Sequence, residues 1–70
     1  MKESAKLGRQ IKHLRIKAGY TRQELSLLSM VNYTTLMNLE NGKTNPKLAT
    51  LNRLAIFLGV RLKDLFDYGD

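Results

Sequence analysis

Residues 21–46 read TRQELSLLSMVNYTTLMNLENGKTNP, and the capping and apolar residues of this stretch decide the fold. Thr21 and Glu24 have the spacing of a capping box, in which each side chain accepts a hydrogen bond from the other residue's backbone. Asn32 is a second residue of a type that caps helices. The stretch therefore predicts two short helices, at about 22–28 and 32–40, joined by about three residues.

Leucines give each of these helices an inward side. Leu25 and Leu28 are expected to face inward from the first helix, and Leu36 and Leu39 from the second. Two short helices with so tight a connection cross steeply, with the small Ser26 at the crossing, and the second can project from the body. A projecting helix fits the major groove of B-DNA.

Outside this stretch, apolar residues recur at helical spacing in three more segments, at about 4–18, 48–57 and 62–66. Their expected buried residues are Leu7, Ile11, Leu14 and Ala18, then Leu48, Leu51, Leu54, Ala55 and Leu58, then Leu62, Leu65 and Phe66. Glycines at 19, 42 and 59 follow helical patterns, where a left-handed residue ends a helix at little cost. We expect one all-α domain of five helices over residues 1–70.

Charge is distributed unevenly along the 70 residues. Residues 1–47 carry nine Lys and Arg against three acids, whereas residues 48–70 carry three against three, so the first part holds all of the net charge of +6. This asymmetry indicates a polyanionic partner. The chain has no cysteine and no apolar run long enough to span a bilayer, which favours a reducing cytoplasm and no membrane contact.

Catalysis is not expected. The sequence has no Ser or Cys with a His and acid partner, no glycine-rich phosphate loop and no metal-ligand cluster, and His13 is its single histidine. We therefore expect neither a metal nor a cofactor. RNA binding is disfavoured because the aromatic residues do not form a stacking platform. Binding of double-stranded DNA is therefore the leading expectation.

From Leu7 to Phe66 the sequence resembles the phage-repressor and Cro type of helix-turn-helix regulators. The residues that carry the resemblance are Leu7-Gly8, Ile11, Leu14-Arg15, Gly19, Thr21 to Leu25, Leu36, Leu39-Glu40-Asn41-Gly42-Lys43, Asn45-Pro46, Thr50-Leu51, Leu54-Ala55, Leu58-Gly59-Val60 and Leu65-Phe66. The resemblance implies a compact five-helix lambda-repressor-like domain with 32–40 as its recognition helix. It also implies a transcriptional regulator that binds an operator as a homodimer.

The resemblance also assigns roles to residues. Base-edge contacts are Tyr33, Thr34 and Asn38, with Met37 and Thr35 as their neighbours; phosphate contacts are Arg22, Asn41, Lys43 and Thr44; Arg15 and Glu40 form a buried ion pair. Chemistry supports these roles, since an asparagine amide can hydrogen-bond an adenine edge and the backbone N–H groups at helix starts can meet phosphates. Tyr33 can alternatively cover the edge of the core, and Arg15 can alternatively be a solvated charge.

Three positions depart from the family pattern. Met30 stands where the turn usually has glycine, so a left-handed conformation is expected to be strained there. Arg22 replaces a frequent glutamine. Lys47 and Arg61 stand where serine-like caps are common, which leaves the starts of the last two helices undefined.

Two functions remain open. The first is a dimeric repressor that occludes a promoter, with an apolar carboxy-terminal surface that includes Val60, Leu62, Phe66 or Tyr68. The alternative is an antitoxin or protein-bridging adaptor, whose main partner is another protein such as a toxin.

Overall fold

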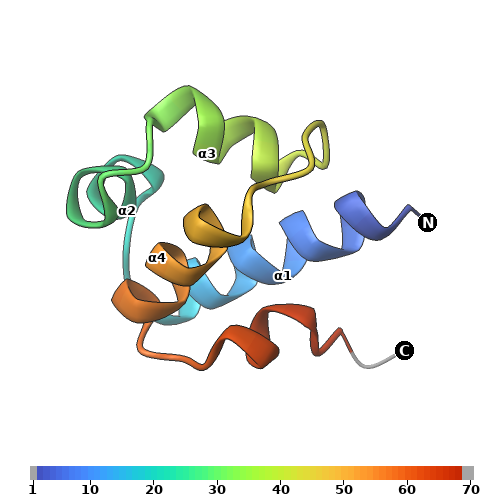
Figure 1. Ribbon diagram of the computed structural model, residues 1–70. Helices are drawn as coiled ribbons and strands as arrows, with labels where there is room; N and C mark the ends of the chain where they lie inside the picture. Colours follow the sequence, from blue (N-terminus) through green and yellow to red (C-terminus); the bar gives the residue numbers. More distant parts are fainter. Residues whose placement is uncertain (1, 69–70) are drawn as a thin grey trace.

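A computed structural model of the protein describes residues 2–68, and every regular element in that range is helical. The elements are α1 (Glu3–Lys17), α2 (Arg22–Ser29), α3 (Tyr33–Glu40), α4 (Leu48–Leu58) and the 3-10 helix η1 (Leu62–Phe66) (Figure 1). The predicted all-α class is confirmed. The last element differs from the expectation, because its five residues wind as a 3-10 helix, a form that proteins use in short pieces.

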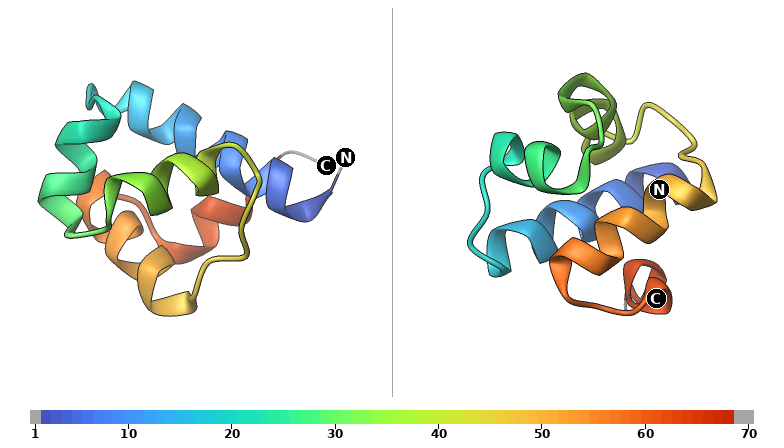
Figure 2. Two further views of the ribbon diagram at one scale, coloured as in Figure 1. Left: turned by 90° about the horizontal axis from the view of Figure 1, so that it is seen from above. Right: turned by 60° about the vertical axis from the view of Figure 1, so that its left-hand side comes forward.

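The helices are arranged so that α3 lies at the outside. In Figure 1, α3 is uppermost and η1 lowest, with α1 and α4 between them. Helix α1 packs against α3 and η1, whereas α2 packs against α3 and α4. The two views of Figure 2 also place α3 at the surface. The fold therefore supports α3 from one side and leaves its other side open.

The core contains leucines from every element. Its buried apolar residues are Leu7, Ile11, Leu25, Val31, Leu36, Leu39, Leu51, Leu54, Ala55, Leu58 and Leu65. Among the described residues, no helix is both long and apolar enough to cross a membrane.

Four residues expected in the core are instead exposed. Leu28 is 44% exposed, because α2 turns Leu25 and Ser29 inward. Leu48 is 65% exposed, since it is the first residue of α4 and precedes the part that packs. Ala18 is the C-cap of α1 and is also exposed, as is Phe66 at the end of η1.

Helix α1 approaches α3 so closely that their backbones touch. A Cβ atom added at Gly8 would lie 2.1 Å from the carbonyl oxygen of Leu39. No flexible side chain can yield at that point, because the contact is with backbone. Nearby, the Ser4 hydroxyl donates to the Gly42 carbonyl oxygen at 3.2 Å. The carboxyl end of α3 is thereby fixed against α1.

The starts of α4 and η1, which the sequence left undefined, differ from each other. Lys47 precedes α4 and its side chain makes no cap hydrogen bond. At η1, the backbone N–H of Arg61 donates to Asp64 Oδ2 at 2.9 Å. Asp64 therefore engages the N–H of the residue before the helix, as the acid of a capping box does.

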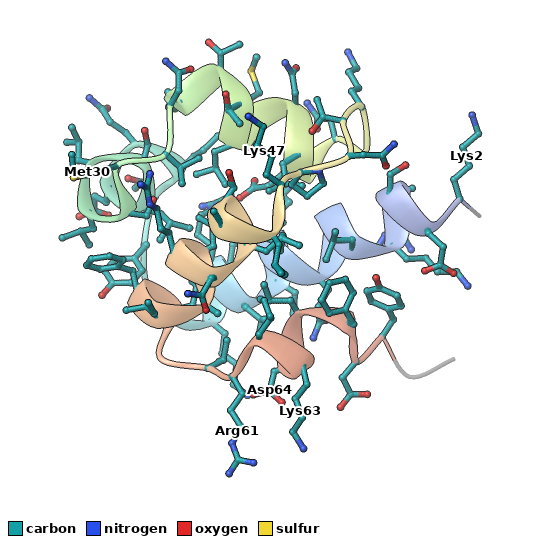
Figure 3. The ribbon with its side chains drawn as sticks, viewed as in Figure 1. Lys2, Met30, Lys47, Arg61, Lys63 and Asp64 are labelled. Carbon is teal, nitrogen blue, oxygen red and sulfur yellow. The ribbon has the colours of Figure 1, made fainter. Side chains whose placement is uncertain are left out.

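The turn between α2 and α3 is closed by two serine hydroxyls. Ser26 Oγ donates to the Val31 carbonyl oxygen at 2.6 Å, and Ser29 Oγ accepts from the Val31 N–H at 3.3 Å. Met30 has φ 59° and ψ 25°, so the predicted left-handed conformation is confirmed. Its side chain is 82% exposed and lies at the edge of the molecule (Figure 3).

We predict that Met30→Gly stabilises the domain by about 1 kcal/mol, because glycine adopts a left-handed conformation without a Cβ clash. Urea unfolding followed by circular dichroism measures the change. Met30→Ala is the matched control, since it shortens the exposed side chain but keeps the Cβ atom. Equal stabilities of the Gly and Ala variants would contradict the prediction.

Candidate nucleic-acid interface

Side chains cap both α2 and α3. Thr21 Oγ1 accepts from the Glu24 N–H at 3.1 Å and Glu24 Oε1 accepts from the Thr21 N–H at 2.8 Å, which confirms the predicted capping box. The hydrogen bonds from the Thr21 backbone and hydroxyl lower the pKa of Glu24. Asn32 Oδ1 accepts from the N–H groups of Thr34 and Thr35. These four N–H groups are therefore already engaged, which leaves fewer at either helix start for a phosphate.

A buried ion pair connects α1 with the end of α3. Arg15 Nε lies 2.7 Å from Glu40 Oε2, and Arg15 Nη2 lies 3.1 Å from Glu40 Oε1. Arg15 Nη1 donates to the Tyr20 carbonyl oxygen at 2.9 Å. The two side chains are only 9% and 0% exposed. This bidentate geometry is the strong form of an arginine–carboxylate contact.

Arg22 joins the same carboxylate from α2. Its Nε donates to Glu40 Oε1 at 3.2 Å, and its side chain is 23% exposed. Its Cζ lies 5.9 Å from the centroid of the Tyr33 ring. Burial lowers the pKa of Arg22, but its interactions with Tyr33 and Glu40 outweigh that effect and raise the pKa above its ordinary value. Arg22 was predicted only as a phosphate contact, so its place in this cluster was not predicted.

The expected base-reading residues lie on the outer side of α3, with Tyr33 at the edge of this side that meets Arg22 of α2. Tyr33, Thr34 and Thr35 are exposed, whereas Met37 and Asn38 are half-buried. Two hollows border this face. One, of about 450 Å³, joins Thr34, Thr35 and Asn38 with Thr44. The other, of about 610 Å³, contains Tyr33 with Arg22, and Met37 lines neither hollow.

The expected phosphate residues are distributed around α3. Arg22 lies near its start, Asn41 and Lys43 are exposed beyond its end, and Thr44 is half-buried in the smaller hollow. Asn45, Lys47 and Thr50 also line this hollow, and none of them was predicted there. Figure 3 shows the Lys47 side chain extending toward α3, whereas Arg61 and Lys63 point away from it. Pro46 could have indicated this arrangement. It lies between α3 and α4, and a reversal of the chain there returns the following residues to the side of α3.

The described residues contain no cluster of three or more His, Cys, Asp or Glu side chains that could hold a metal ion. The surface around α3 instead combines amides, hydroxyls and cationic groups. Such groups can hydrogen-bond base edges and phosphate oxygens.

We predict that Glu40→Gln lowers the free energy of unfolding by about 3 kcal/mol, because it leaves the buried Arg15 without its counter-charge. Urea unfolding measures the loss. Glu24→Gln is the matched control and should change stability little, since Glu24 is exposed and glutamine also serves in a capping box. Similar losses in both variants would contradict a special role for the buried carboxylate.

Comparisons with known proteins agree with this geometry. A sequence model of the family described as Helix-turn-helix matches residues 11–65. The chain is 36% identical over 61 residues to an uncharacterized HTH-type transcriptional regulator of Archaeoglobus fulgidus, covering 87% of each protein. It is 33% identical over 69 residues to the HTH-type transcriptional regulator DdrOP3 of Deinococcus deserti, covering 93% of this chain and 54% of that protein.

Solved structures have the same fold. The restriction-modification controller protein C.AhdI of Aeromonas hydrophila superposes with a TM-score of 0.87 at 27% identity, over 90% of this chain and 96% of that one. The clp gene regulator ClgR of Corynebacterium glutamicum superposes with a TM-score of 0.91 at 25% identity, over 97% of this chain and 72% of that one. The chain therefore belongs to the phage-repressor and Cro type of helix-turn-helix regulators.

Proposed function

We propose that this protein regulates transcription by binding a specific double-stranded DNA operator, with α3 in the major groove. The observation that carries the proposal is the open polar face of α3, which is held against the core by its opposite side. An α-helix is the element that the major groove accepts. The names of the relatives, which describe transcriptional regulators, support the same function. This function is binding rather than catalysis.

The proposed contacts follow the position of each side chain. Tyr33, Thr34 and Asn38 meet base edges, with Met37 and Thr35 as neighbours; Arg22, Asn41, Lys43 and Thr44 meet phosphates. The Asn38 amide can pair with an adenine edge. The exposed Lys43 follows Gly42, where the chain leaves α3, so its charge can reach the DNA backbone. Lys47 joins the phosphate contacts because its side chain extends to the same side (Figure 3).

We also propose that two copies bind together. A single α3 makes few contacts, whereas a two-fold dimer places two such helices about 34 Å apart, one turn of DNA. Phe57 on α4 and Phe66 on η1 are 41% and 46% exposed, and these two elements pack against each other. Val60, Leu62 and Tyr68 instead pack partly against the core. The dimer surface is therefore centred on Phe66, and repression by promoter occupancy is the simplest mechanism.

A toxin or another protein as the main partner is less well supported. The relatives and neighbours described above are named as regulators or as a controller protein. Because their names describe regulation, operator binding is the function that we propose.

We predict that Asn38→Ala and Lys43→Ala weaken DNA binding in different ways. Loss of the Asn38 amide should reduce discrimination at one base pair by about 1–3 kcal/mol. Loss of the Lys43 charge should weaken binding to all duplexes and reduce the slope of log affinity against log salt by about one. Fluorescence anisotropy over a salt series, with each single-base variant of the site, measures both effects. Equal losses on every duplex for both variants would contradict this division of roles.

Selection of bound sequences from a random duplex library tests the function itself. We predict a palindromic consensus whose half-sites are about 10 base pairs apart, centre to centre. Absence of any enriched sequence at low salt would reject specific DNA binding. An enriched but asymmetric consensus would retain DNA binding and reject the two-fold dimer.

A further inference from the structure

We propose that Arg22 is a positioning residue for DNA reading: anchored on Glu40, it holds the Tyr33 ring at the start of α3. This inference rests on the proposed function, because it assigns a means of specificity to the same surface. It differs from the role of a simple phosphate contact, in which Arg22 contributes only a charge.

The anchor is a carboxylate that is already held in place. Arg15 makes two hydrogen bonds to Glu40, and its own position is fixed by a third bond to the Tyr20 carbonyl oxygen. The Glu40 side chain is fully buried. Arg22 Nε therefore donates to an oxygen atom, Glu40 Oε1, that Arg15 already holds in position. This bond restrains the Arg22 side chain, which extends from the buried pair to the surface.

Helix geometry explains how one arginine reaches both Glu40 and Tyr33. The two residues are seven positions apart, so they lie on nearly the same face of α3, about 10 Å apart along its axis. Helical side chains lean toward the amino terminus, which brings the Glu40 carboxylate back toward Tyr33. Arg22, the first residue of α2, lies across this face. Its guanidinium connects the two ends of the eight-residue helix.

Charge balance leaves Arg22 available to the aromatic ring. Two arginines share one carboxylate, so the cluster keeps one net positive charge. The Cζ–centroid distance of 5.9 Å lies within the range of a cation–π contact. Tyr33 is 44% exposed, so no core packing fixes its outer part. The Arg22 contact therefore restrains the orientation of a ring at the edge of the face that we propose reads DNA.

The experiment compares Arg22→Gln, Arg22→Lys and the matched control Lys43→Gln, each alone and combined with Tyr33→Leu. Affinities are measured by fluorescence anisotropy for the selected duplex and for its variant at the base pair where Tyr33→Leu relaxes discrimination. A salt series is included. Lysine keeps the charge but not the planar guanidinium or its Nε–H, so Arg22→Lys separates positioning from charge.

We expect Arg22→Lys to keep the salt slope of the original protein yet to lose about threefold or more of the discrimination at that base pair. Arg22→Gln should lose the same discrimination, and neither Arg22 change should add to the loss caused by Tyr33→Leu. The loss of affinity caused by Lys43→Gln should instead add fully to the loss caused by Tyr33→Leu. Full discrimination in Arg22→Lys, or additivity of Arg22→Gln with Tyr33→Leu, would overturn the proposal and leave a simple phosphate contact.

A measurement without DNA separates this inference from the proposed function. We expect the Tyr33 ring current to displace the NMR shifts of the Arg22 side-chain protons, and this displacement should vanish in Tyr33→Leu. The Tyr33 ring shifts should move in Arg22→Lys and not in Lys43→Gln. Unchanged Tyr33 shifts in Arg22→Lys would overturn the positioning role, even if operator binding is confirmed. Failure to bind any duplex would reject the proposed function and leave this measurement to decide the contact itself.

Discussion

The buried carboxylate of Glu40 is the interaction on which the rest of the structure depends. Arg15 of α1 and Arg22 of α2 both bind it, and Glu40 itself is the last residue of α3. Three helices therefore meet at one charge. A buried carboxylate is tolerated when cationic donors surround it, so a shift of one helix that broke these contacts inside the core would leave an unpaired charge in a medium of low dielectric constant. This constraint fixes the orientation of α3 more specifically than apolar contact, which has no direction.

The position of α3 depends strongly on the Glu40 contacts because α3 is short. A helix of eight residues is unstable in water by itself, since nucleation is costly and few hydrogen bonds follow. Its inner side contributes Leu36 and Leu39 to the core, and its start is capped by Asn32. Thr34 and Thr35 on the outer side are exposed. Residues such as Thr34 and Thr35 are consequently available for recognition, because the fold does not use their side chains.

Much of this arrangement could be predicted from local patterns. Helical spacing of leucines located the helices, the Thr21 and Glu24 pair located the capping box, and the absence of glycine at Met30 indicated a strained turn. The Arg15–Glu40 partnership was predicted only from the resemblance, because residues 25 positions apart have no local signal. Leu28 and Leu48 were wrongly predicted to be buried. Helical periodicity shows which face of a helix a residue lies on, but not how far a neighbouring helix covers that face. Glu40 also binds a second arginine, Arg22, and Lys47 approaches α3. Neither feature could be predicted from local patterns, because both depend on three-dimensional packing.

The contact between Gly8 and the Leu39 carbonyl oxygen sets a limit on how this protein can be redesigned. A larger residue at position 8 would push α3 outward and tilt it, which would change how deeply it enters a groove. Because the neighbouring atoms belong to the main chain, no compensating exchange of side chains can restore the fit. New operator preferences therefore have to be made by changing the outer residues of α3, while its height and angle on the scaffold stay constant.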